Sequence, residues 1–118
     1  MSTVKVDTIK TTGNVEVYTC KAWVNFDGQV AASNMIRASG NVSSITDHGT
    51  GDYTVNFSNN MTDVNYCVVY TTGHWSGSNY WGPIAYTNTH STSGVRIRNN
   101  FDTGTYYDAP TNNVAVFR

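Results

Sequence analysis

Alternation of apolar and polar side chains with a period of two residues is the feature that most constrains how this chain folds. It is clearest from Asp52 to Phe57, where Tyr53, Val55 and Phe57 share one face. Successive side chains of a strand point to opposite faces of a sheet, so this pattern is typical of a β-strand with one buried face. The same period recurs along most of the chain, and we therefore predict an all-β protein.

Further short strands are predicted between clusters of Gly, Asn, Asp and Pro. They cover Lys21–Phe26, Tyr66–Thr71, Trp81–Thr87, Val95–Arg98 and Asn113–Arg118. Tyr66–Thr71 is apolar on both faces, which predicts a central strand covered on both sides. Pro83 cannot donate a ladder hydrogen bond, so its strand is predicted at a sheet edge. Short strands at intervals of about 10 to 15 residues predict a β-sandwich or jelly-roll-like head.

Residues 1–19 differ in composition from the rest of the chain, because they are rich in Thr and Val. Thr3–Ile9 and Asn14–Tyr18 alternate in the same way and are separated by a Thr12–Asn14 turn, which predicts a small hairpin. We expect 1–19 to be a short extended arm or hairpin, and 20–118 to be the head. Within the head, Asn34–Arg37 is predicted to form one helical turn, and 47–51 a loop.

The composition excludes several classes of protein. The chain has no Leu and one Glu, but 17 Thr, 14 Asn and 10 Ser, which disfavours helical bundles and coiled coils. A net charge of -1 disfavours nucleic-acid binding by bulk electrostatics. No apolar run approaches the roughly 20 residues of a membrane span, and the first residues lack the apolar core of a secretion signal. Neither membrane insertion nor secretion is expected.

The cysteines and histidines predict neither a disulfide nor a metal site. Cys20 and Cys67 lie in apolar or strand-like contexts, and we expect free, buried thiols. The histidines are far apart and lack ligand spacing, so no metal or cofactor is expected. One alternative is left open, because in a symmetric trimer a single histidine near the axis would be presented three times.

A resemblance to a known family begins in the first strand of the predicted head. It is carried by KAWVNF at 21–26, IRAS at 36–39, NVSSITD at 41–47 and GTGDYTVNF at 49–57, with VRIR at 95–98 and VAVF at 114–117. These segments resemble the C-terminal, receptor-binding domain of tailed-bacteriophage tail fibres of the kind found in marine and cyanobacterial phages. The opening VKVDTI at 4–9 resembles the segment that precedes such heads. The likeness covers most of residues 1–66 and is thin from 71 to 93.

The resemblance implies a virion component, assembled in the host cytoplasm, that contacts the bacterial surface during adsorption. It also implies a homotrimer, because phage fibres are usually trimeric. Such a domain normally caps a longer fibre, whereas here only residues 1–19 precede the head. The chain would then be a stubby fibre, attached through residues 1–19 to a baseplate or another phage tail protein.

Two aromatic clusters punctuated by glycine are the candidate receptor-binding residues. They are His74, Trp75, Asn79, Tyr80 and Trp81 in one cluster, and Asp102, Tyr106, Tyr107 and Asp108 in the other. Aromatic faces stack on sugar rings while Asn, Ser and Asp bind ring hydroxyls, and loops on a rigid scaffold commonly carry binding. Alternatively, Tyr80 and Trp81 begin a strand and pack inside. Trp23 is expected in the core or in a subunit interface.

We consider the arginines and carboxylates as glycan-binding and catalytic residues. Arg96 and Arg98 share one strand face, where they either contact an anionic glycan, form a solvated face, or pair with Asp residues across subunits. A glycosidase needs two placed carboxylates, usually including a Glu, and the one Glu is Glu16 in the arm. Any pair would come from Asp47, Asp63, Asp102 or Asp108. The sequence has no nucleophile or phosphate-loop motif, so we do not expect an enzyme. We expect a fibre protein that binds a glycan such as lipopolysaccharide. The alternatives are a purely structural baseplate or fibre-network protein and a free-standing bacterial lectin.

Overall fold

The computed structural model describes residues 3–73, 84–100 and 104–118 of the chain. These residues form eight strands and one short 3-10 helix, η1 (Ala32–Asn34). The strands are β1 (Cys20–Phe26), β2 (Ile36–Gly40), β3 (Val42–Gly49), β4 (Asp52–Phe57), β5 (Cys67–Gly73), β6 (Ile84–His90), β7 (Gly94–Asn100) and β8 (Thr111–Phe117). The all-β prediction is confirmed.

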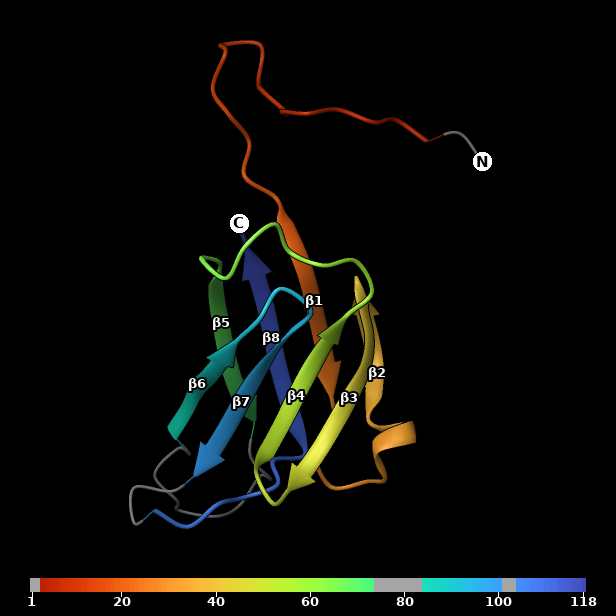
Figure 1. Cartoon of the computed structure of the whole chain (residues 1–118), viewed down its shortest axis with the longest axis vertical. Helices are drawn as coiled ribbons and strands as arrows, with labels where there is room; N and C mark the ends of the chain where they lie inside the picture. Colours follow the sequence, from red (N-terminus) through yellow and green to blue (C-terminus); the bar gives the residue numbers. More distant parts are fainter. Residues whose placement is uncertain (1–2, 74–83, 101–103) are drawn as a thin grey trace.

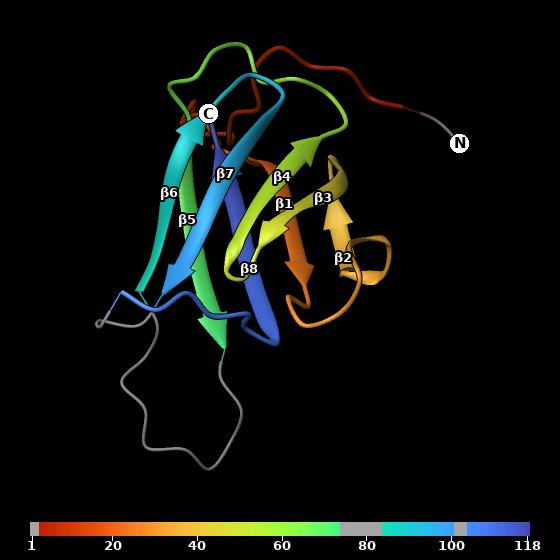
Figure 2. The same ribbon diagram turned by 60° about the horizontal axis from the view of Figure 1, so that its bottom comes forward.

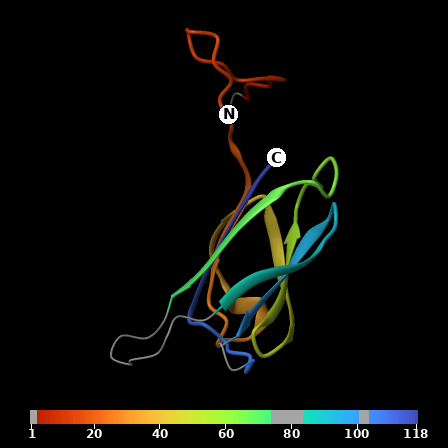
Figure 3. The ribbon, with the colours of Figure 1, turned by 90° about the vertical axis from the view of Figure 1, so that its left-hand side faces the viewer.

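The strands form two antiparallel four-stranded sheets that pack face to face (Figure 1). One sheet has the order β2-β1-β8-β5 and the other β3-β4-β7-β6. The two layers are visible edge-on in Figure 3, with the N-terminal arm projecting beyond one end. The fold is therefore a β-sandwich, as the strand spacing predicted.

The core lies between the sheets and is built by the predicted alternation. In β1 the inward residues are Ala22, Val24 and Phe26, and in β4 they are Tyr53, Val55 and Phe57. The rings of Phe26 and Tyr53 meet edge to face across the core, with centroids 5.2 Å apart. Val95 and Ile97 from β7 and Val114 and Val116 from β8 complete the layer.

The predicted central position of Tyr66–Thr71 is wrong, because β5 is the last strand of its sheet. Tyr66 is buried just before the strand, but Val69 is 50% exposed on the outer face. Among residues 3–73, 84–100 and 104–118, no further layer covers the apolar residues on that face. Two other expectations about this face are wrong. Cys20 and Cys67 are free, as expected, but exposed and not buried. Trp23 is 44% exposed, so it does not belong to the core, which was one of its two expected positions.

Strands β2 and β3 were not expected from the sequence. The helical turn predicted at Asn34–Arg37 is wrong, since η1 ends at Asn34 and β2 begins at Ile36. The loop predicted at 47–51 is shorter, because β3 continues to Gly49. Register shifts at both ends of the β3–β4 pairing break the period of two in β3, which hides the strand from a pattern search.

The arm contains the predicted small hairpin, although its two sides form an isolated bridge and not full strands. An isolated bridge pairs Lys10 with Glu16, and the Thr11 amide donates to the Val15 carbonyl at 2.8 Å. Asn14 occupies the turn with a φ of 64°. β1 then begins at Cys20 and enters the sandwich. Within the part of the chain that the structure describes, no helix is long and apolar enough to cross a membrane.

Candidate functional site

The end of the sandwich opposite the arm gathers segments that are distant in sequence (Figure 2). The β3–β4 turn, the loop after β1 and the segment 104–110 before β8 all meet there. The Gly28 amide donates to the Ala109 carbonyl at 2.9 Å, and the Tyr107 amide donates to the Asn99 carbonyl at 3.1 Å. These bonds fix the segment 104–110 to both sheets, and we call this region the loop end.

Asp108 connects the two sheets at the loop end. Its Oδ1 accepts a hydrogen bond from the Gly51 amide at 2.8 Å and another from the Tyr53 hydroxyl. Tyr53 is fully buried, and this burial raises the pKa of its phenol far above the usual value, with the Asp108 carboxylate adding to the rise. Asp108 is half-buried, and this oxygen is engaged within the protein.

The turn that presents the Gly51 amide requires glycine. Gly51 has a φ of +64°, and a Cβ there would collide with the Asn99 carbonyl oxygen and lie 2.8 Å from the Tyr107 amide nitrogen. The close approach of the backbones, together with the left-handed conformation, leaves no space for a side chain. Gly51 therefore sets how closely the β3–β4 turn approaches 104–110.

An aromatic and cationic cluster lies next to this turn on the outer face of the β3-β4-β7-β6 sheet. The guanidinium carbon of Arg98 lies 5.9 Å from the centroid of the Tyr106 ring, a distance suited to a cation–π contact. Tyr106 remains 42% exposed. A hydrogen bond with Tyr106 is the largest cause of the raised pKa of Tyr86, its neighbour on β6.

Two arginines of this cluster share one carboxylate. Arg96 binds Asp52 through two hydrogen bonds, with Nε to Oδ1 at 2.9 Å and Nη2 to Oδ2 at 2.8 Å. The Nε of Arg98 lies 3.3 Å from the same Oδ2. The Arg96 hydrogen bond is the largest cause of the lowered pKa of Asp52. The arginines thus pair within the chain, across the β4–β7 register, and among the described residues of this cluster two positive charges face one negative charge.

A hollow of about 210 Å³ adjoins Arg96 on the same face. Thr54 and His48 form one wall, with the His48 Nε2 and the Thr54 hydroxyl 2.7 Å apart. Gly94 forms the floor, since a Cβ there would lie 2.7 Å from the Val55 carbonyl oxygen. The hollow therefore offers a hydroxyl, an imidazole and a guanidinium to a small polar ligand.

Only part of the predicted receptor-binding set can be placed. His74, Trp75, Asn79, Tyr80, Trp81 and Asp102 lie outside the described residues. Tyr106, Tyr107 and Asp108 are together at the loop end: Tyr106 is exposed over Arg98, and Tyr107 is half-buried with its carbonyl bonded to the Asn99 side chain at 3.0 Å. Of these three, Tyr106 presents the most open side chain.

The sequence did not single out Asp52, Tyr86 or His48 as site residues. The alternation in β4 already places Asp52 and Thr54 on one face, and that in β7 places Arg96 and Arg98 on one face. The sequence does not reveal the strand register, which pairs Asp52 with Arg98 and Thr54 with Arg96. This register brings the polar faces of β4 and β7 together.

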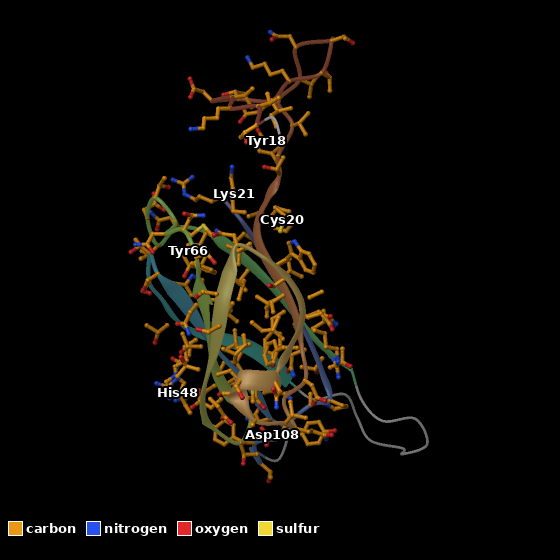
Figure 4. All side chains as sticks on the ribbon, turned by 90° about the vertical axis from the view of Figure 1, so that its right-hand side faces the viewer. Tyr18, Cys20, Lys21, His48, Tyr66 and Asp108 are labelled. Atoms are coloured by element: carbon orange, nitrogen blue, oxygen red, sulfur yellow. The ribbon has the colours of Figure 1, made fainter. Side chains whose placement is uncertain are left out.

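The candidate carboxylates that the structure describes are only partly brought together. Asp108 is at the loop end (Figure 4) and Asp47 lies in β3 close to the β3–β4 turn, whereas Asp63 lies in the connection between β4 and β5 and binds Arg118. Across residues 3–73, 84–100 and 104–118, His, Cys, Asp and Glu form no group of three or more that could hold a metal ion.

Comparison of the chain with family models, curated proteins and solved structures finds no match in any of the three.

Proposed function

We propose that this chain is a short tail-fibre protein of a tailed phage, whose head binds a glycan on the bacterial surface during adsorption. The observation that carries the proposal is the polarity of the molecule: the arm projects from one end of the sandwich, and the aromatic and arginine cluster lies near the other (Figure 1). A fibre needs attachment and recognition at opposite ends, and this arrangement supports the proposal.

The resemblance supports the framework of the proposal rather than its receptor. Its strongest segment, 49–57, coincides with the β3–β4 turn and β4, and the segment where it begins, 21–26, coincides with β1. These elements contribute the inward side chains Val24, Tyr53 and Val55. The resemblance therefore concerns the buried scaffold, whereas receptor specificity belongs to the loops, where the likeness is thin.

The chemistry of the loop end favours a glycan with acidic groups. Tyr106 offers an exposed ring for stacking on a sugar, and Arg98 beneath it is only partly neutralised by Asp52. Phosphate and carboxylate groups of lipopolysaccharide match that excess positive charge. Binding is non-covalent and without turnover, and weak sites gain strength from three copies and from several fibres on one virion.

The arm supports attachment. Val4, Val6, Val15 and Tyr18 are exposed to between 58% and 85%, which is unfavourable in water unless another surface covers them. We propose that residues 1–19 bind a baseplate or other tail protein and help to assemble a homotrimer. In its mature state the protein is then part of the virion.

The test is adsorption of the isolated chain, labelled at its N-terminal amine, to a panel of marine and cyanobacterial strains. We expect decoration of some strains, competition by lipopolysaccharide purified from them, and at least a roughly tenfold loss in Tyr106→Ala, as for an interface anchor. Trp75→Ala tests the other aromatic cluster, which contains His74, Trp75, Asn79, Tyr80 and Trp81, in the same way. Thr46→Ala, an exposed change on the same sheet, is the control.

Other outcomes separate the alternatives. If no strain is decorated although the virion adsorbs, the purely structural baseplate or fibre-network function replaces the proposal. The uncovered outer face of the β2-β1-β8-β5 sheet is the observation that favours this second candidate. A free-standing lectin is separated by gene neighbourhood, because a fibre gene lies among baseplate and tail genes.

A further inference from the structure

Away from its β2 edge, the outer face of the β2-β1-β8-β5 sheet carries no charged side chain among the described residues that the strand registers place there. The register pairs place on this face Cys20, Trp23 and Asn25 of β1, Ala38 and Gly40 of β2, Cys67, Val69 and Thr71 of β5, and Asn113, Ala115 and Phe117 of β8. We call these residues the uncharged face. Arg37 brings a charge to the β2 rim, where its Nη1 lies 3.5 Å from the Asn25 Oδ1 and its Nη2 lies 3.3 Å from the Asp27 Oδ2.

Apolar residues form adjacent rows across this face. Ala115 pairs with Trp23 on one side and Val69 on the other, and Phe117 pairs with Cys20 and Cys67. Trp23, Val69 and Phe117 are exposed to 44%, 50% and 38%. A row of half-exposed large apolar side chains on a flat sheet is typical of a surface that another protein layer covers.

The indole of Trp23 is held in place by its neighbour. It lies across Gly40 of β2, where a Cβ would be 2.9 Å from the Cδ1 atom of the ring. Beside it is a hollow of about 300 Å³, with Ala115 in its floor and Val69 in its opposite wall. The small side chains on both sides thus leave a fixed aromatic ring next to a space that a partner's side chain can enter.

The other sheet shows that an uncharged outer face is not a general property of this fold. At equivalent positions its outer surface carries Asp52, Arg96 and Arg98 together with His48 and Thr54. A surface without charge can pack against the same surface region of another copy without leaving an ion desolvated.

The arm continues the same apolar surface beyond the sheet. Tyr18 precedes Cys20, and the two lie at the arm end of the head in Figure 4. Tyr18 is 79% exposed, Val17 is 40% exposed and Ile9 is 47% exposed. A second copy of the chain carries both surfaces in the same order, so one partner can cover the face and the arm together.

We infer that the uncharged face is the interface between copies of this chain, with Trp23 as its anchor and the hollow over Ala115 as the receiving site. The inference rests on the homotrimer of the proposed function and assigns its contact surface. The cluster at Tyr106 and Arg98 lies on the opposite sheet, so assembly through this face leaves it accessible.

The first measurement is the mass in solution by light scattering. We expect the wild type at three times the chain mass of 13.0 kDa. Val69→Arg places a charge on an exposed position of an edge strand, so the chain folds but its assembly is lost. Thr46→Arg is the matched control on the outer face of the other sheet and is expected to keep the wild-type mass. Circular dichroism checks that both variants are folded.

The second measurement uses the two native thiols and does not depend on any variant. Cys20 and Cys67 flank Phe117 on the uncharged face and are exposed in the single chain. In the assembled wild type we expect a thiol reagent to react at least roughly tenfold more slowly than in urea, because the reaction then requires dissociation. In Val69→Arg both thiols are expected to react at the full rate.

The outcomes distinguish this inference from the proposed function. An oligomer whose thiols react at the full rate, or that persists in Val69→Arg, overturns the uncharged face as the interface and leaves the homotrimer in place. A monomer at every concentration overturns both the interface and the homotrimer, while binding to cells still decides the receptor function. Loss of assembly in Thr46→Arg as well as Val69→Arg also overturns the assignment, since the effect would not be specific to one face.

Discussion

The hydroxyl of Tyr53 donates a hydrogen bond to the carboxylate of Asp108, a residue 55 positions further along the chain. Tyr53 belongs to the β3-β4-β7-β6 sheet, and Asp108 lies in the connection that leads into β8 of the other sheet. The same carboxylate oxygen accepts the Gly51 amide. These two hydrogen bonds therefore add a side-chain link to the backbone bonds that hold this connection between the sheets.

We predict that Tyr53→Phe lowers the free energy of unfolding by about 1.5–3 kcal/mol, the usual range for a hydrogen bond to a charged group. Urea denaturation at pH 7 measures it. Combined with Asp108→Asn in a double-mutant cycle, the pair should show a coupling energy of about 0.5–3 kcal/mol. Tyr66→Phe is the comparison, because its hydroxyl binds only the neutral carbonyls of Ser91 and Gly94, at 2.8 and 2.9 Å. Strictly additive effects of Tyr53→Phe and Asp108→Asn would contradict the prediction.

A second prediction compares two glycines that both have positive φ. Gly51→Ala should destabilise the protein strongly, because its Cβ meets the backbone of Asn99 and Tyr107. Gly104 has a φ of +85° but open space around it, so Gly104→Ala carries only the conformational cost of about 1–2 kcal/mol. Thermal unfolding of the two variants checks this order, and equal losses would show that crowding at Gly51 has no effect.

The Asp52–Arg96 pair predicts a pH dependence at the acid end. Arg96 holds the pKa of Asp52 below its ordinary value of 3.8. In the unfolded chain Asp52 takes up its proton first as the pH falls, so the stabilisation is complete above pH 3.8 and is lost below it. We expect Asp52→Asn to lower stability at neutral pH and to flatten the dependence below pH 3.8. Urea midpoints across the acid range measure this, and unchanged slopes would contradict it.

The pairing of Asp63 with Arg118 gives a prediction for a single titration. The Nη2 of Arg118 lies 2.7 Å from the Asp63 Oδ2, and this bond, with the Asn65 amide, lowers the pKa of Asp63 to about 2. Carboxyl ¹³C NMR across the acid range should show that value, and Arg118→Ala should move it toward 3.8. The pair is exposed, so its removal should leave the unfolding midpoint nearly unchanged.

The sequence predicted the fold where one face of a strand is buried and the other is polar. β4 follows this rule, and its inward residues Tyr53, Val55 and Phe57 were identified from alternation alone. β5 does not follow it, because the apolar residue Val69 faces outward. Apolar patterning reports which side chains avoid water in the functional molecule, and cannot tell a second core layer from a partner surface.

The candidate site was less predictable than the core. Tyr106 was found because aromatic residues beside glycine are conspicuous, and it is exposed. Asp108 was grouped with it on the same grounds, although its Oδ1 accepts hydrogen bonds from the Gly51 amide and the Tyr53 hydroxyl. The Asp52–Arg96–Arg98 group depends on strand register, which is set by long-range packing and is not written in any local segment.

The strand order has a consequence for how the chain reaches this structure. β3 pairs with β4 across a tight turn and β6 with β7 across another, so much of one sheet is assembled from neighbours in sequence. In the other sheet β8 lies between β1 and β5, and joining Val24 to Val114 closes a loop of almost the whole head. Closing long loops is entropically costly and slows folding. We therefore expect the β3-β4-β7-β6 sheet to form in the rate-limiting transition state and the uncharged face to be completed last, after the opposite surface is already in place.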